Sequence, residues 1–177
     1  MFNNINTRSI TFNLVAINVV LFLATLAFPQ LDQLLGLHYI FNTHHYVEDS
    51  NFAPYQIVTH MFMHGGFMHI FFNMFALFMF GIVLERVWGP TRFLLFYFIT
   101  GLGAAFLHIA VQALIVYNYT GSVHPPLATV MEYSQLAQLY VTPTVGASGA
   151  IFGVLVAFGM LFPNTELIFL FFPVPIK

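Results

Sequence analysis

The 177-residue chain is 59% hydrophobic and 6% charged, with a formal net charge of −2, and its mean hydropathy is +0.85. These values exclude a soluble globular domain, and with only four Lys and Arg residues the chain has no surface that could follow a nucleic-acid backbone. Because the sequence has no cysteine, disulfides, thiol nucleophiles and cysteine-ligated metal centres are excluded as well.

Four apolar stretches come close to the length of about 20 residues that a membrane-spanning helix needs. The first follows a polar start without a cleavage site of small residues, so we expect it to stay in the protein rather than to be removed as a signal peptide. The tail from residue 167 is too short to span and is broken by Pro173 and Pro175. We predict an all-α, polytopic membrane helix bundle that forms a single domain over residues 1–177, with transmembrane helices at residues 10–28, 66–84, 93–117 and 145–162.

The basic residues lie in alternate connections, all on one side of the predicted helices, as the positive-inside rule describes for the cytoplasmic side. They lie before the first helix, between the second and third, and after the fourth: Arg8, Arg86, Arg92 and Lys177. The two long connections, residues 29–65 and 118–144, contain no Lys or Arg but carry acidic residues: Asp32, Glu48, Asp49 and Glu132. We therefore expect a cytoplasmic amino terminus and both long connections on the outer side.

Three polar side chains are predicted to meet near the outer face. At a rise of about 1.5 Å per residue, His69 lies roughly 25 Å above Arg86 at the cytoplasmic end of its helix, and Ser148 lies roughly 24 Å above Asn164. Asn73 lies one turn below His69 on the same helix face. Polar groups inside a membrane are costly, so we interpret this convergence as a functional site, with packing between helices as the alternative.

The residues around Ser148 suit acyl transfer. Ser148 lies in GASGA, residues 146–150, where glycines let the backbone come close and a helix start offers free amides to a developing oxyanion. Gly149, Gly153 and Ala157 also form a small-residue stripe that permits close packing between helices. Packing alone and a nucleophile setting are therefore equally good explanations of this motif.

Three segments together resemble the rhomboid family of intramembrane serine proteases in order, spacing and topology: PYQIVTHMFMHGGFMHIFFNM (54–74), ERVWG (85–89) and GASGAIFG (146–153). The resemblance covers nearly the whole chain from the first helix onward and implies four helices of a six-helix core. It implies that Ser148 is the nucleophile and that His69 and Asn73 donate to the oxyanion, beside the Ser148 amide. Gly146 and Gly149 are then the motif glycines, and Gly146 begins the tight turn into the fourth helix.

His60 and His64 match family histidines at the mouth of the second helix, and we expect them to be structural. Their i, i+4 spacing would also suit a metal ion, but no third ligand or catalytic carboxylate follows, so we expect neither a metal nor a cofactor. Glu85, Arg86 and Gly89 are expected to form a structural helix end, with glycine at the stop, proline after it and charges at the membrane interface.

His108 and Gln112 on the third helix are polar residues without an assigned role. Counting from Arg92, His108 lies roughly 24 Å up its helix, at the depth of Ser148, which would allow the two side chains to meet. The family gives the third helix no catalytic part, and a hydrogen bond between helices is the more frequent role of such residues. We therefore expect an interhelical hydrogen bond here.

The base that takes the proton from the serine is missing from this sequence. Rhomboids carry it as a histidine on the sixth helix, after the serine, and here no histidine follows His124. The ending FFPVPIK resembles the family's approach to its fifth helix, so we expect the chain to be a fragment that does not hydrolyse peptides by itself. The first outer connection also lacks the Trp-Arg pair of many rhomboids.

The function implied for the complete protein is cleavage of membrane-anchored proteins near the outer face by a Ser-His dyad. We expect a multi-pass protein of the bacterial inner membrane whose partners are transmembrane substrates and lipid. The alternative is a proteolytically dead rhomboid-like protein that binds client helices, which the missing histidine favours and the presence of Ser148, His69 and Asn73 opposes. A transporter or channel would carry polar residues through the full depth rather than toward one face.

Overall fold

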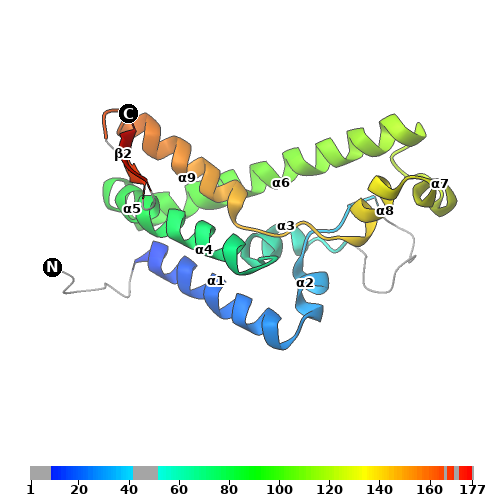
Figure 1. Ribbon diagram of the computed structural model, residues 1–177, viewed down its shortest axis with the longest axis horizontal. Helices are drawn as coiled ribbons and strands as arrows, with labels where there is room; N and C mark the ends of the chain where they lie inside the picture. Colours follow the sequence, from blue (N-terminus) through cyan, green and yellow to red (C-terminus); the bar gives the residue numbers. More distant parts are fainter. Residues whose placement is uncertain (1–8, 42–51, 166, 170–171, 177) are drawn as a thin grey trace.

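The computed structural model describes residues 9–41, 52–165, 167–169 and 172–176. Long helices form the body of an elongated molecule, and the short helices α7 and α8 lie at one end (Figure 1). This arrangement confirms the predicted all-helical membrane bundle. The apolar helices are α1 (Ile10–Ala27), α4 (Phe67–Ala76) continuing through the π-helical turn η2 (Leu77–Gly81) into α5 (Ile82–Trp88), α6 (Pro90–Thr120) and α9 (Ser148–Leu161).

The helices differ in their capacity to cross a membrane. Within the described residues, three helical stretches are long and apolar enough to span, at 18, 22 and 31 residues. Helix α9 has only 14 residues, or about 21 Å, against a hydrocarbon core of about 30 Å. It begins later than the predicted residue 145 because Gly146 has a φ of 130°, which is not a helical conformation. Ser148 therefore lies at the start of a short helix rather than inside a long one.

Glu85 ties the start of α1 to α5. Its carboxylate accepts hydrogen bonds from the Ser9 hydroxyl at 2.8 Å, the Ile10 amide at 2.8 Å, and the amide and hydroxyl of Thr11 at 2.9 and 2.7 Å. These amides have no acceptor within their own helix, and a negative charge is favourable at a helix amino terminus. Glu85 thus holds two helices together, beyond the helix-end role expected from the sequence.

Gly89 separates α5 from α6. It has a φ of 82°, its amide donates to the Glu85 carbonyl, and Pro90 is the first residue of α6. Glycine tolerates this positive φ, which would strain a residue with a side chain. Proline suits the first helical position because its missing amide would have no partner there. Arg86 is exposed in the last turn of α5.

The two long connections contain short helices. The first holds α2 (Gln30–Leu35), α3 (Gln56–Thr59) and the 3₁₀ turn η1 (His60–Phe62), and the second holds α7 (Leu127–Glu132) and α8 (Ser134–Val141). Helix α6, at 31 residues, is about 46 Å long and exceeds the thickness of the hydrocarbon core. Its far end packs with both connections through a buried cluster of Tyr39, Val116, Val130, Leu136 and Tyr140.

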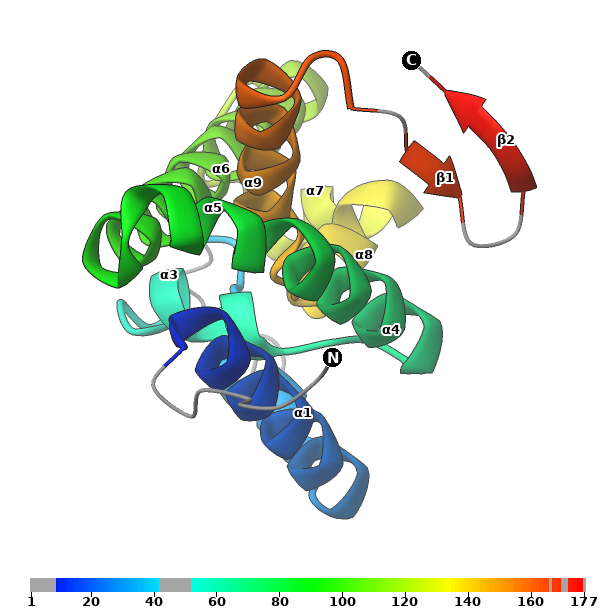
Figure 2. The same ribbon diagram turned by 90° about the vertical axis from the view of Figure 1, so that its left-hand side faces the viewer.

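The carboxyl-terminal residues form a hairpin and not a helix. Strand β1 (Leu167–Phe169) pairs in antiparallel orientation with β2 (Phe172–Ile176), with Leu167 opposite Ile176 (Figure 2). Pro173 and Pro175 lie in β2. Both would be excluded from the interior of a helix, because proline lacks the amide that a helix needs. The hairpin agrees with the prediction that the tail does not span.

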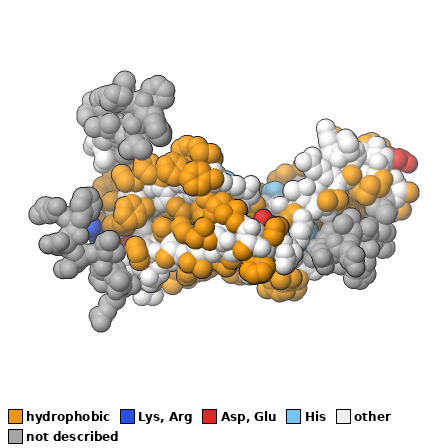
Figure 3. All heavy atoms as spheres, turned by 60° about the horizontal axis from the view of Figure 1, so that its bottom comes forward, with side chains coloured by type: hydrophobic (Ala, Val, Ile, Leu, Met, Phe, Trp, Pro, Cys, Tyr) orange, Lys and Arg blue, Asp and Glu red, His pale blue; other side chains and the backbone are white. Residues whose placement is uncertain are grey.

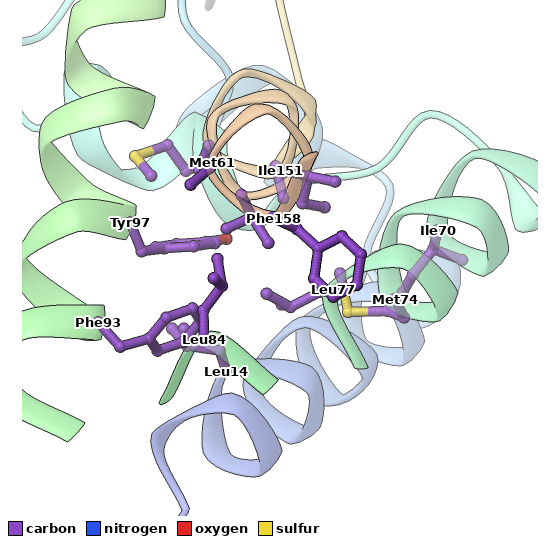
Figure 4. Close-up of a cluster of buried hydrophobic side chains, with 14 residues drawn as sticks. Leu14, Met61, Ile70, Met74, Leu77, Leu84, Phe93, Tyr97, Ile151 and Phe158 are labelled. Atoms are coloured by element: carbon purple, nitrogen blue, oxygen red, sulfur yellow. The ribbon is translucent and has the colours of Figure 1, made fainter. Parts of the chain in front are cut away.

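The core lies where α1, α4 to α5, α6 and α9 converge. Tyr97 and Phe93 of α6, Leu84 of α5 and Leu77 of η2 are fully buried there, and Phe158 reaches in from α9 (Figure 4). Hydrophobic side chains are not confined to this core, and they cover much of the outer surface of the body as well (Figure 3). Apolar surface on this scale is expected of helices that face lipid.

Helices α6 and α9 approach closely because α9 carries glycine where they touch. A Cβ added at Gly149 would lie 2.5 Å from Cβ of Ala104, and one at Gly153 would lie 2.6 Å from Cβ of Thr100. Neither neighbour has a flexible end that could move aside. The small-residue stripe predicted from the sequence is therefore a contact surface.

Gly153→Ala is expected to destabilise the protein, since the new methyl group would meet the stiff, β-branched Thr100. Inserting a methyl into a well-packed contact typically costs about 1–3 kcal/mol. Thermal unfolding in detergent would measure the effect. Gly159→Ala, on the same helix with nothing within 4 Å of the added atom, is the matched control, and equal unfolding temperatures for the two variants would contradict the close contact.

Candidate active site

Residues 143–147, here named the approach segment, lead directly into Ser148. Thr144 exchanges two backbone hydrogen bonds with Leu37, at 2.9 and 2.8 Å. The amide of Gly146 donates to the carbonyl of His60 at 2.8 Å. The first long connection, distant in sequence, therefore holds the backbone just before Ser148.

Ser148 is the first residue of α9, and its side chain is exposed. The preceding residue, Ala147, makes no side-chain capping bond, so the first-turn amides have no acceptor within the helix. Unpaired amides beside a serine hydroxyl are what an oxyanion hole requires.

The ring of His69 lies against the approach segment. A Cβ added at Gly146 would lie 2.9 Å from Cε1 and Nε2 of His69 and 3.6 Å from Oγ of Ser148. Since Gly146 has no side chain, the imidazole from α4 can come beside the hydroxyl from α9. Two residues that are 79 positions apart in the sequence are brought together here.

Asn73 lies one turn further along α4. Its side chain is buried, and its Nδ2 donates to the backbone carbonyl of His69 at 2.9 Å. In the part of the chain that the structure describes, no hydrogen bond joins Ser148 to either Asn73 or His69. The role of His69 and Asn73 as hydrogen-bond donors to the oxyanion therefore stays a prediction.

His60 begins the turn η1 and His64 follows it, and both side chains are buried. Nδ1 of His60 is hydrogen-bonded to the Gln56 carbonyl at 2.9 Å, and burial lowers the pKa of His60. The ring of His64 packs edge-to-face on His69 with centroids 5.1 Å apart. Burial, and then the nearby His69, lower the pKa of His64 to about 4, so His64 is neutral at pH 7.

The spacing that suggested a shared metal ion is not helical. The turn η1 ends at Phe62, and Met63 is extended, with a ψ of 147°. His60 and His64 therefore do not stack as i, i+4 neighbours on one helix. Among the residues that the structure describes, no group of three His, Asp or Glu could hold a metal ion.

A cavity of about 190 Å³ lies beside Ser148. Its polar side chains come from η1, α6, the approach segment and the start of α9, and small residues of α6 form part of its apolar wall. The residues that line it are Leu37, His60, Met61, Gly101, Ala104, Ala105, His108, Thr144, Val145, Gly146, Ser148, Gly149 and Ala150.

His108 belongs to this cavity. Its Nε2 lies 2.7 Å from Oγ1 of Thr144 in a hydrogen bond. The sequence predicted a bond between helices, whereas the partner lies in the approach segment. Gln112, one turn further, is buried, and its Oε1 has no partner within the described ranges. No local pattern distinguishes Thr144 or Leu37, so both were missed by sequence reasoning.

The sequence model of the Rhomboid domain matches residues 51–177. The chain belongs to the rhomboid family. This match covers α4 to α9 and every predicted site residue, so the site lies within the rhomboid domain.

Several curated proteins show the same relationship. Rhomboid protein 1, mitochondrial, of Saccharomyces cerevisiae is 31% identical over 120 residues, covering 67% of this chain and 28% of that protein. Rhomboid protease AarA of Providencia stuartii is 37% identical over 97 residues, covering 55% and 30%. Rhomboid-like protein 15 of Arabidopsis thaliana is 36% identical over 69 residues, covering 39% and 17%. The chain spans less than a third of the length of these relatives.

Proposed function

We propose that the full-length protein is a serine endopeptidase that cleaves membrane-anchored proteins near the outer face of the bilayer, with Ser148 as nucleophile. The observation that carries this proposal is the meeting of the His69 ring and the Ser148 hydroxyl at Gly146, at the start of α9. The similarity to a protein named as a rhomboid protease supports the same reaction class.

In the proposed reaction, Oγ of Ser148 attacks the scissile carbonyl carbon and its proton passes to a base. The amide of Ser148, with His69 and Asn73, would donate hydrogen bonds to the oxyanion that forms. The C–N bond then breaks, the amine leaves with a proton, and water hydrolyses the acyl-enzyme. We propose that the base is a histidine of a later helix, outside residues 1–177.

The substrate would be a transmembrane segment that unwinds locally. A membrane helix keeps its amides and carbonyls in internal hydrogen bonds, which hide the scissile bond. Small or helix-breaking residues lower the cost of opening the helix. The exposed side chain of Ser148 at the start of α9 is suited to an extended strand rather than an intact helix.

The test is cleavage of a single-span substrate by the full-length protein in liposomes, with the cut site located by mass spectrometry. We expect one cut near the outer end of the span and covalent labelling of Ser148 by a fluorophosphonate. The chain of residues 1–177 is expected to give no cleavage. Ser148-dependent cleavage by that chain would instead place the base within it, and helix binding without cleavage would support the client-binding alternative.

We also propose that the protein lies in a bacterial inner membrane with its amino terminus in the cytoplasm. Because the chain has no cysteine, single cysteines report topology directly. Ser134→Cys on α8 should react with an impermeant thiol reagent on intact cells, whereas Thr91→Cys, exposed at the start of α6, should react only after permeabilisation. The reverse pattern would show an inverted topology.

A further inference from the structure

One face of α6 contacts the chain on both sides of Ser148. Ala104 would be 2.5 Å from a Cβ added at Gly149, and His108, one turn later, bonds Thr144 at 2.7 Å. Residues four apart lie on the same face of a helix. A single rigid element therefore holds the chain both before and after the serine.

Of these two contacts, the one at Thr144 restrains the approach segment, which is less rigid than the helix that follows Ser148. Between Thr144 and Ser148 lies Gly146, which has the largest backbone freedom of any residue type and adopts a φ of 130°. Backbone bonds to Leu37 and His60 hold the approach segment from the first connection. The bond from His108 adds a restraint from α6, on the cavity side.

We propose that His108 is a positioning residue: its hydrogen bond to Thr144 holds the approach segment against α6, so that Ser148 and the first-turn amides stay beside the His69 ring. This inference rests on the proposed function of Ser148. His108 itself then moves no proton in the reaction. Its effect passes through the Thr144 hydroxyl, which distinguishes it from a direct catalytic role in the same cavity.

The test compares conservative and disruptive changes of both partners in the full-length protein. His108→Leu and Thr144→Val each remove the bond, whereas His108→Gln and Thr144→Ser keep a donor or a hydroxyl in place. A misplacement of about 1 Å can lower a rate on the order of a hundredfold. We expect the disruptive variants to lower kcat and the rate of fluorophosphonate labelling by about ten- to a hundredfold, with little change in KM, and the conservative variants to retain most activity.

The double variant His108→Leu/Thr144→Val should be no slower than either single variant, because both remove one bond. Gln112→Leu, on the same helix but outside the cavity lining, is the matched control and should retain full activity. Additive losses, or an unaffected Thr144→Val, would overturn the proposal. If His108→Gln were as slow as His108→Leu while Thr144→Val stayed active, His108 would be a proton carrier instead.

Hydrogen exchange supplies a readout that does not depend on proteolysis. We expect faster exchange of the amides of residues 144–149 in the two disruptive variants and unchanged exchange in the conservative ones. Unchanged exchange in all four variants would refute the restraint. Absence of Ser148 labelling in the unmodified protein would refute the proposed protease function alone, since exchange still decides whether His108 holds the segment.

Discussion

Ser148→Ala is expected to abolish cleavage of a transmembrane substrate while leaving the protein folded. The hydroxyl is the only nucleophile proposed, and loss of a catalytic serine typically costs on the order of a million-fold in turnover. Its side chain is exposed and at the first position of α9, so its removal leaves no buried cavity. Cleavage in liposomes would be measured together with thermal unfolding.

Ser134→Ala is the matched control, because Ser134 is also exposed and also begins a helix, α8, in the second connection. This variant should cleave at the rate of the unmodified protein. Turnover by Ser148→Ala above the uncatalysed background would show that another group attacks the substrate. Loss of folding in Ser148→Ala but not in Ser134→Ala would instead give the serine a structural role.

His69→Ala and Asn73→Ala are expected to slow the enzyme without silencing it. Asparagine has no useful pKa, so a pair that includes it is suited to donating hydrogen bonds rather than to accepting the serine proton. Loss of one oxyanion donor typically costs about a hundred- to a thousandfold in kcat. The kcat of each variant should be lower than that of the unmodified protein by this factor. Residual activity should still depend on Ser148, and KM should change little.

The control for this pair is Phe72→Ala, a change on α4 at a side chain that is 52% exposed. It should leave kcat unchanged. Complete loss of activity in His69→Ala would identify His69 as the base, and unchanged kcat in both polar variants would show that His69 and Asn73 only pack the bundle. Asn73→Ala also removes the bond to the His69 carbonyl, so its unfolding temperature is needed to separate positioning from lost stability.

The sequence by itself determined the helical membrane architecture and the family, and it predicted the residues of the site. Long apolar stretches specify helices because only internally hydrogen-bonded backbone is stable in lipid. The glycines of the small-residue stripe indicated where α9 would pack, and Gly149 and Gly153 lie where a side chain would collide with α6. The motifs around His69 and Ser148 indicated the family, which the match over residues 51–177 confirmed.

Only the tertiary structure decided how these residues are held. Glu85 at the start of α1, Leu37 against Thr144, and His108 against the same threonine each join residues at least 36 positions apart. Such pairs follow no helical or strand period, so no local pattern predicts them. At the start of α9 the two levels agree: Pro143 and Gly146 disfavour helix locally, Gly146 has a φ of 130°, and the backbone bonds of Thr144 and Gly146 to the first connection hold this segment in place. Packing between distant segments decides where Ser148, at the start of this short helix, lies relative to His69.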